Sequence, residues 1–237
     1  MDILAPSPNR LLASLVSSDL DLIKPHLREN ELVHAAVLAV AGDELKQAYF
    51  PHSGIISLVV RLSMGETTEV AMVGRESLFG ASAALGSPRA LTTAMVQSPG
   101  MCSVIPIKRL QAATEESKTI RTVLTQHEQA IFLQTQQSAG CLASHAGIAR
   151  LARWLLRARD AAGTDELHFT QDFLGQMLGV QRNAVSSVAG TLQDRGLITF
   201  SRAQIRILDA SGMKAIACEC YETVKNGLQH LKGGTLH

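Results

Sequence analysis

The chain of 237 residues and 25.4 kDa has the length of one large domain or two ordinary ones. Hydrophobic residues make up 46% of it, charged residues 18%, and the net charge is only +1, which excludes intrinsic disorder and gives no strong global field for nucleic acid. No apolar run approaches the roughly 20 residues of a membrane-spanning helix, and the start Met1-Asp2-Ile3 lacks the basic residues of a signal peptide. We therefore expect a folded cytoplasmic protein without a membrane partner.

Short apolar or alternating runs, separated by turn residues, fill residues 32–107. Turns are expected at Ala41-Gly42-Asp43, Pro51-His52-Ser53-Gly54 and Ser98-Pro99-Gly100. Many short strands between tight turns predict a β-sandwich or barrel, and the Gly-, Ala- and Ser-rich stretch 74–86 predicts a short helix between loops. The expected strands are Leu32–Ala39, Gln47–Phe50, Ile55–Leu62, Thr67–Val73, Leu91–Gln97 and Met101–Ile107.

A long helix is predicted over Ser117–Ala143, which contains no proline and a single glycine near its end. Its apolar positions approximate one stripe, which either packs on the helix's own domain or forms a dimer seam. For the seam, the expected residues are Ile120, Leu124, His127 and Ile131.

A second helix is predicted over Ala146–Asp160, because Ile148, Leu151 and Leu155 recur at the spacing of one buried face. On another side, Arg150, Arg153 and Arg157 form a basic stripe, which is either a solvated face or a phosphate-facing one. The basic excess of this part of the chain is mild: residues 1–144 carry 11 Lys and Arg against 13 Asp and Glu (−2), and residues 145–237 carry 11 against 8 (+3).

The most specific pattern is TQDFLGQMLGVQRNAVSSVAGTLQDRG, residues 170–196. Thr170 is a suitable N-cap for a first helix, Gly179 allows a sharp turn, and a second helix starts near Arg182. The small Gly175 and the apolar Val185 suit two helices that cross steeply. These features predict a helix-turn-helix.

A strand, turn and strand are predicted directly after the second helix, over Leu197–Leu208. Hairpins after helices are also common in protein cores. Here the tip carries Arg202 and the return strand Arg206, which suits phosphate contact by a wing.

With the helix-turn-helix and the wing in place, the chain resembles regulators of the Crp/Fnr family, which includes cyclic AMP receptor protein and the fumarate-nitrate reduction regulator. The resemblance covers nearly all of residues 10–225, and the phrases Tyr49–Gly54, Val70–Glu76 and Leu151–Leu156 are similar to a subgroup of the family. It implies an α+β fold with three parts. These are a β jelly-roll of the cyclic-nucleotide-binding type over 1–116, a dimerisation helix over 117–144, and a winged helix-turn-helix domain over 145–237.

The resemblance implies a homodimer on double-stranded DNA, with recognition helices in successive major grooves of a roughly palindromic site. Family members often read bases with Arg, Glu and Arg, and the matching positions here are Arg182, Asn183 and Ser187. Only the first is retained, so we expect a different operator; Arg182 either pairs with a guanine edge or touches phosphate alone. The full expected DNA-contacting set is Thr170, Gln171, Gln181, Arg182, Asn183, Ser186, Ser187 and Arg202.

The resemblance also implies an effector pocket, which looks degenerate. Arg75 stands where the family places a glutamate for the ribose, and Thr92 replaces the arginine that pairs with the cyclic phosphate. Arg89 lies three residues upstream and would fit only if the loop were shifted. We therefore expect no cyclic AMP binding and no other identifiable cofactor. The expected pocket residues are Gly74, Arg75, Glu76, Ser77, Leu78, Arg89, Thr92 and Thr93.

No metal site is predicted from the four cysteines, because no pair of Cys-x-x-Cys motifs closes a tetrahedral site. Cys218 and Cys220 would point about 200° apart on a helix, which favours ordinary packing over a sensor thiol. The family's iron–sulfur cluster needs cysteines near the amino terminus, and the first cysteine here is Cys102. A lone histidine such as His34 or His52 is more often hydrogen-bonded than a haem ligand.

Two other classes of function are alternatives to a DNA-binding regulator. A cupin-type β-barrel enzyme needs a metal triad with a His-x-His motif, which the sequence lacks. A protein-interaction module would use the wing for a protein instead of DNA, and salt-dependent duplex binding separates it from a DNA-binding protein. We expect a transcription regulator, not an enzyme, for which the resemblance also allows RNA polymerase as a partner.

Overall fold

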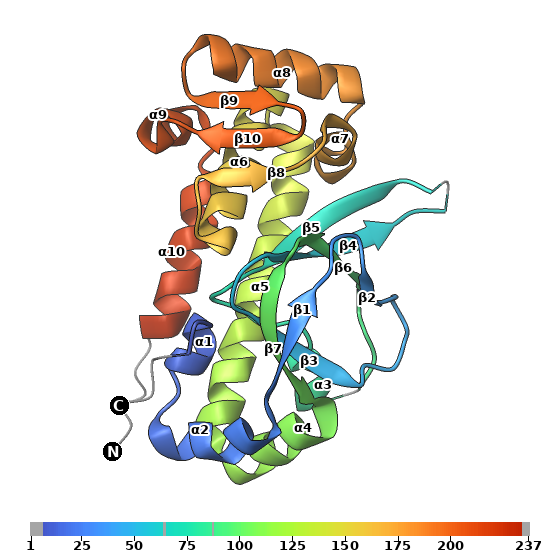
Figure 1. The fold of residues 1–237 in the computed structure, drawn as a ribbon, viewed down its shortest axis with the longest axis vertical. Coiled ribbons are helices and arrows are strands. Elements are labelled where there is room, and N and C mark those ends of the chain that lie inside the picture. The colour runs from blue at the N-terminus through green and yellow to red at the C-terminus, as the bar shows by residue number, and fades with distance from the viewer. Residues whose placement is uncertain (1–6, 64, 87, 234–237) are drawn as a thin grey trace. The chain divides into compact units, whose positions relative to one another are not determined.

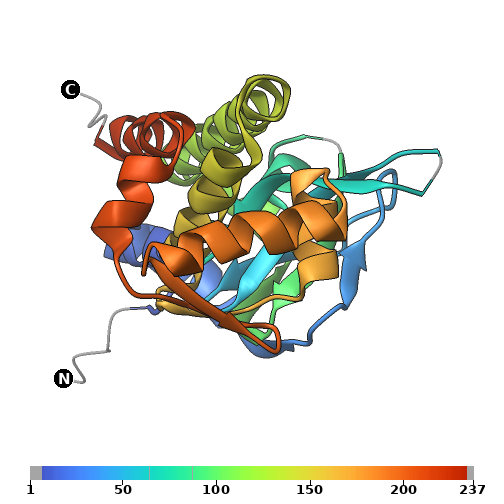
Figure 2. The same ribbon diagram turned by 90° about the horizontal axis from the view of Figure 1, so that it is seen from above.

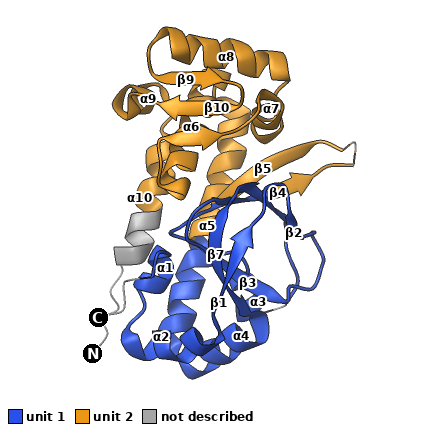
Figure 3. Cartoon of the chain, viewed as in Figure 1, with its two compact units in different colours: residues 1–58, 73–129 blue, residues 59–72, 130–237 orange. Residues whose placement is uncertain are grey.

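A computed structural model describes residues 7–63, 65–86 and 88–233 (Figure 1). The first and last residues of the expected domains, 1–6 and 234–237, lie outside that description. By contacts, the chain divides into two compact units (Figure 3). Unit 1 comprises residues 1–58 and 73–129, and unit 2 comprises residues 59–72 and 130–237. The division differs from the three expected segments, because residues 59–72 group with the carboxy-terminal part and the boundary crosses the long helix.

The strands of the first half form two sheets. One has the order β1-β7-β3, with β1 (Arg28–Leu32), β7 (Gly100–Pro106) and β3 (Gln47–Pro51) antiparallel; Leu32 pairs with Gly100 and Gln47 with Pro106. The other has the order β2-β6-β4-β5, with β2 (Val37–Ala39), β6 (Thr93–Ser98), β4 (Ile55–Arg61) and β5 (Thr67–Val73). The expected β-rich sensor domain is confirmed.

The expected strand Leu32–Ala39 is wrong as a single element. Leu32 ends β1, and Val37 begins β2 in the other sheet. Between them Ala35 has φ 62°, a left-handed conformation that an extended strand cannot contain. Most of β1 is the polar run Arg28–Glu31, whose side chains are exposed, so hydrophobic alternation could not reveal it.

Short helices complete the first part of the chain. They are α1 (Arg10–Ala13), α2 (Ser17–Ile23), the 3₁₀ turn η1 (Lys24–His26), α3 (Ala81–Leu85) and α4 (Ile107–Glu116). The short helix expected within 74–86 is confirmed as α3. The start of α1 is fixed by Asn9, whose Oδ1 accepts from the amides of Leu11 and Leu12, both at 3.0 Å.

The predicted long helix is confirmed as α5 (Lys118–Ser144). Three residues of its expected seam, Ile120, Leu124 and His127, are wrong because they are buried within the single chain, whereas Ile131 is only half-buried and stays a prediction. The apolar stripe of the sequence is therefore the inner face of α5. The exposed side carries Phe132, with 62% of its surface exposed, and further along Gln136, Ala139 and Ala143.

Unit 2 is built around α6 (Gly147–Ala162), which contacts α7 (Gln171–Leu178), α8 (Arg182–Asp194), α9 (Ala210–Ile216) and α10 (Cys220–Gly233). A small sheet has the order β8-β10-β9, formed by β8 (Glu166–His168), β10 (Gln204–Ile207) and β9 (Ile198–Ser201). Trp154 and Phe169 pack edge to face at its core, with ring centroids 4.8 Å apart. Among the described helices, none has the length and apolarity needed to span a membrane.

Candidate DNA-binding surface and sensor residues

The predicted helix-turn-helix is confirmed as α7 and α8. Thr170 caps α7, because its Oγ1 accepts from the amide of Phe173 at 3.1 Å. Gly179 ends α7 with φ 62°, a conformation that favours glycine. Gly175 is required by close packing, since a Cβ there would lie 2.8 Å from the Val180 carbonyl oxygen.

The recognition helix α8 presents a polar outer face and an apolar inner one. Val185, Ala189 and Leu192 are buried, whereas Gln181, Arg182, Asn183 and Ser187 are exposed. Figure 2 shows α8 along the outer side of unit 2, with the hairpin of β9 and β10 beside it. Four of the expected contact residues therefore lie together at the amino-terminal end of α8.

Three of the expected contact residues also have bonds within the helix-turn-helix: Ser186 and Gln171 join α8 to α7, and Thr170 caps α7. Ser186 is half-buried and its hydroxyl donates to Gln171 Oε1 at 3.0 Å. Thr170 is occupied by its capping bond. These three positions consequently have a structural role whether or not they touch DNA.

Arg182 has a partner that the sequence analysis missed. Its Nη1 lies 3.4 Å from Oδ2 of Asp172, and both side chains are mostly exposed. Asp172 stands in the first turn of α7, where an acidic residue is ordinarily explained by the helix dipole alone. Exposed ion pairs contribute about 0–1 kcal/mol, so Arg182 can leave Asp172 for a ligand at small cost.

The predicted wing is confirmed as β9 and β10, which pair from Ser201–Gln204 to Ile198–Ile207. Its tip consists of Arg202 and Ala203, with φ of 49° and 68°. Positive φ at both central residues is the geometry of a tight hairpin turn that Asn and Gly usually occupy. The strained tip holds the exposed Arg202 at the end of the hairpin. Arg206, on the return strand, lies 3.8 Å from Glu166.

The arginines of the basic stripe on α6 are buried or half-buried. Arg157 is buried with 7% of its surface exposed, and Arg150 and Arg153 are half-buried. Arg150 Nη1 donates to the Leu142 carbonyl at 3.3 Å. Both interpretations of the stripe are therefore wrong for Arg157, and for the half-buried Arg150 and Arg153 they stay predictions.

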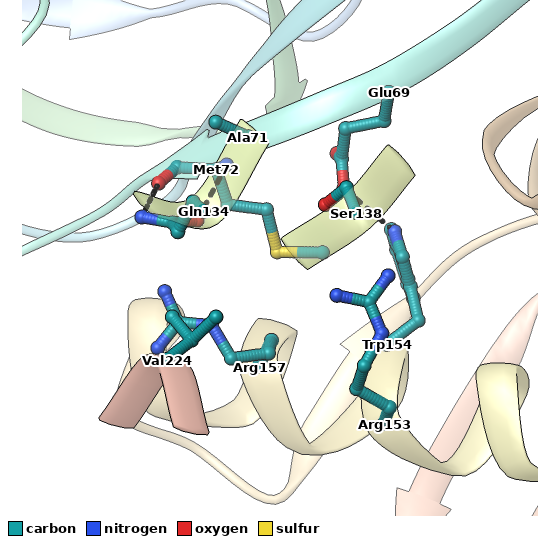
Figure 4. A pocket seen from close by; sticks show the side chains of 9 residues that line it. All are labelled: Glu69, Ala71, Met72, Gln134, Ser138, Arg153, Trp154, Arg157 and Val224. Atoms are coloured by element: carbon teal, nitrogen blue, oxygen red, sulfur yellow. Dashed lines mark hydrogen bonds between the residues drawn. The ribbon is translucent and has the colours of Figure 1, made fainter. Parts of the chain in front are cut away.

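A polar cluster inside unit 2 joins β5 to the helices (Figure 4). The indole N–H of Trp154 donates to Glu69 Oε1 at 2.7 Å, and the Gln134 side-chain oxygen accepts from the Met72 amide at 3.2 Å. Arg153 and Arg157 line the same cavity, whose volume of about 10 Å³ suits a single water molecule. Strand β5 is thus fixed to α5 and α6 by hydrogen bonds. Glu69 and Gln134 were missed because neither belongs to a local motif.

The loop of the expected effector pocket is attached to α5 through His127. Nε2 of His127 accepts from the Leu78 amide at 3.2 Å and lies 2.6 Å from the Ser77 hydroxyl, which must then donate. This explains why a histidine interrupts the apolar stripe: its ring nitrogen is hydrogen-bonded to the loop at Ser77 and Leu78.

The other expected pocket residues differ in their exposure and in their hydrogen-bond partners. Arg75 and Thr92 are half-buried, and Arg89 is exposed with its Nη1 bound to the Gly42 carbonyl at 2.9 Å. Thr93 accepts from the Ala41 amide at 3.3 Å. A cavity of about 310 Å³ is lined by residues that precede the expected pocket residues in the chain. They are Leu38, Ala39, Asp43–Gln47 and Tyr49. None of the eight expected pocket residues lines that cavity: Gly74, Arg75, Glu76, Ser77, Leu78, Arg89, Thr92 and Thr93.

The two histidines considered as haem ligands are both hydrogen-bonded. His34 Nδ1 lies 3.0 Å from the Gln97 carbonyl and His52 Nε2 lies 2.8 Å from the Ser103 hydroxyl. Burial lowers the pKa of His52, and the negative charge of Glu29 acts in the opposite direction.

Comparison with known protein families finds a match in each half of the chain. The model of the cyclic nucleotide-binding domain matches residues 30–117, and that of the Crp-like helix-turn-helix domain matches residues 149–216. The global nitrogen regulator of Synechococcus elongatus is 24% identical over 177 residues, which cover 71% of this chain and 80% of the relative.

Solved structures show the same fold. FixK2 from Bradyrhizobium japonicum superposes with a TM-score of 0.69 at 16% identity, covering 81% of this chain and 98% of FixK2. The c-di-GMP responsive global regulator CLP of Xanthomonas campestris gives 0.66 at 16% identity, covering 82% and 100%. With a cyclic nucleotide-binding-type domain followed by a Crp-like helix-turn-helix, the chain belongs to the Crp/Fnr family of transcription regulators.

Proposed function

We propose that the protein is a cytoplasmic homodimer that binds a roughly palindromic promoter site and that its sensor domain does not bind cyclic AMP. The observation that carries the DNA-binding mode is the exposed group Gln181, Arg182, Asn183 and Ser187 at the start of α8. Arginine pairs with guanine edges and asparagine with adenine edges in the major groove. One α8 reads one half-site, so a two-fold site requires two chains.

The dimer seam is assigned to the exposed side of α5. Phe132, Gln136, Ala139 and Ala143 are all exposed and recur at intervals of four, three and four residues, which is the spacing of a helix–helix seam. The small Ala139 and Ala143 allow two helices to approach closely. A second copy of α5 would cover the exposed Phe132 ring.

The test of this function is selection of duplexes from a random library by the purified full-length protein, followed by binding titrations at several salt concentrations. We expect an enriched sequence with two inverted half-sites about one helical turn apart and an affinity that falls with salt. Enrichment of no sequence, together with salt-independent or undetectable duplex binding, would favour a protein-interaction module. RNA polymerase is a further proposed partner, for which co-purification on the selected promoter is the test.

Arg182→Ala is expected to weaken binding to the selected operator more than binding to random DNA. Loss of a bidentate pair with guanine costs roughly 1–3 kcal/mol. Arg202→Ala, at the exposed wing tip, should instead weaken both about equally and reduce the salt slope by about one unit. Fluorescence anisotropy on both duplexes measures the two variants. Equal losses for Arg182→Ala on operator and random DNA would contradict its base-reading role.

Cyclic AMP and cyclic GMP are expected to leave DNA binding unchanged. Arg75 and Thr92 stand where the family pocket has its two charged contacts to the cyclic nucleotide. If each contact contributes roughly 1.5 kcal/mol, their loss weakens cyclic-nucleotide binding more than a hundredfold. Arg89, the substitute nearest in sequence, is engaged by Gly42. Calorimetric titration is the measurement. A saturable micromolar isotherm that Arg89→Ala abolishes would show that a rearranged pocket survives.

A further inference from the structure

Three of the four cysteines meet one histidine at the junction between α5 and the last two helices. Cys141 lies near the end of α5 and His145 directly after it, while Cys218 and Cys220 lie between α9 and the start of α10. One ligand atom from each of these four residues lies within 4.8 Å of all the others. All four belong to unit 2.

The expectation that Cys218 and Cys220 point about 200° apart on one helix is wrong. Cys218 precedes α10, which begins at Cys220, so the 200° separation of a continuous helix does not apply. Both thiols therefore point to the same cluster. We propose that Cys141, His145, Cys218 and Cys220 form a tetrahedral site for a single Zn²⁺ ion.

Two of the distances between ligand atoms are close to those of such a site, and all the others are at most 4.8 Å. Zn–S bonds are about 2.3 Å long and Zn–N bonds about 2.05 Å. In a tetrahedral site two sulfur atoms therefore lie about 3.8 Å apart, and a sulfur and a nitrogen atom about 3.6 Å apart. The Cys141 and Cys218 sulfur atoms are 3.5 Å apart, and Cys220 Sγ is 3.5 Å from His145 Nδ1. Three thiolates and an imidazole are the donor set that selects zinc among common divalent ions.

The surroundings hold the ligands in the way that zinc ligands are held. His145 turns Nδ1 toward the thiols, and its Nε2 lies 3.1 Å from Glu219 Oε1, which gives the carboxylate–histidine–metal arrangement. Gln137 Nε2 donates to Cys220 Sγ at 3.0 Å. Neither contact is needed to pack three small thiols.

A nearby cation balances the charge of the proposed site. Three thiolates, a neutral histidine and Zn²⁺ carry a net charge of −1. Arg153 lies close enough to Cys141 to act on it electrostatically. Nε of Arg153 is buried and has no hydrogen-bond partner among the described residues. On binding, one Zn–N and three Zn–S bonds form and three thiol protons pass to solvent.

The site would be structural. All four positions are filled by protein, which leaves no open position for a water or substrate. Cys141 and Cys220 are 0% and 1% exposed, and Cys218 is 8% exposed. Within unit 2 the ion would tie the end of α5 to the start of α10.

The test uses the reduced, full-length protein and Zn²⁺ or Co²⁺ alone as probes. We expect about one zinc per chain by elemental analysis and, after cobalt substitution, the intense visible bands of tetrahedral Co²⁺ with thiolate-to-cobalt charge transfer. Cys141→Ser, Cys218→Ser and Cys220→Ser should each lose stoichiometric binding. Cys102→Ser is the matched control, because Cys102 is equally buried but lies in unit 1, and it should bind normally.

Glu219→Gln tests the site even if the cysteine variants fail to fold, because the Glu219 side chain is 74% exposed. It should fold normally and bind zinc roughly 10–100-fold more weakly, as measured by competition with a chelator. The proposal is overturned if the reduced protein binds neither ion, if binding survives in the three cysteine variants, or if the metal is iron with acid-labile sulfide. A Cys141–Cys218 disulfide in anaerobically purified protein, seen by mass spectrometry, would overturn it as well.

Discussion

Replacing Phe132 with aspartate is expected to convert the proposed dimer into a monomer and to lower affinity for a two-half-site operator by roughly 10²–10⁴-fold. Phe132 is 62% exposed in the single chain, so the substitution should leave the monomer's own fold largely intact. In a helix–helix seam it would place two unpaired charges in a desolvated contact. Loss of the second recognition helix then removes the gain from linked binding.

Sedimentation at micromolar concentration and anisotropy titrations on duplexes with one and two half-sites measure these effects. Affinity for a single half-site should change little. Leu91→Asp is the matched control, since Leu91 is 78% exposed and belongs to unit 1, whereas Phe132 belongs to unit 2, and this variant should remain dimeric. A wild-type species near 25 kDa alone, or a dimeric Phe132→Asp protein, would contradict the assigned seam.

The helix-turn-helix was predictable because its determinants are local. The cap at Thr170, the left-handed Gly179 and the close approach at Gly175 each act within a few residues. The same holds for the wing, whose strands are joined by a two-residue turn. Short-range backbone chemistry is readable from one sequence, and the structure follows it closely here.

The sequence-based predictions were wrong where a residue's role depends on partners far away in the chain. His127 appears on the stripe of α5, but its bonds go to Ser77 and Leu78, about fifty residues earlier in the chain. Arg157 appears to belong to a basic face, but it is buried. Helical periodicity shows that a face exists, and it cannot tell a partner in the same chain from one in a second copy.

The cysteine cluster shows the same limit for candidate sites. Cys141 and Cys218 are 77 residues apart, and neither lies in a paired Cys-x-x-Cys motif. Spacing rules find metal sites built from adjacent ligands. Only the packing of α5 against the chain around Cys218 brings these thiols together.

Gly175→Val is expected to disrupt the helix-turn-helix and abolish specific DNA binding. The turn folds back on Gly175: its carbonyl accepts from the Val180 amide at 2.9 Å, and a Cβ would lie 2.8 Å from the Val180 carbonyl oxygen. Because that neighbour is backbone, the turn itself must move. Overpacking of this kind costs about 3 kcal/mol or more for a branched side chain. That exceeds the gain of under ~1 kcal/mol from replacing a helical glycine.

The displacement matters for function because Val180 is followed directly by Gln181 and Arg182. Moving the turn changes the position of the start of α8, and with it the position of all the side chains proposed to read bases. Gly175→Ala should show a smaller effect in the same direction. Gly190→Val is the matched control for stability, because a Cβ at Gly190 in α8 meets nothing within 4 Å, and its unfolding midpoint should not fall. If thermal unfolding shows Gly175→Val to be as stable as Gly190→Val, with operator affinity retained, then the tight turn does not set the position of the recognition helix.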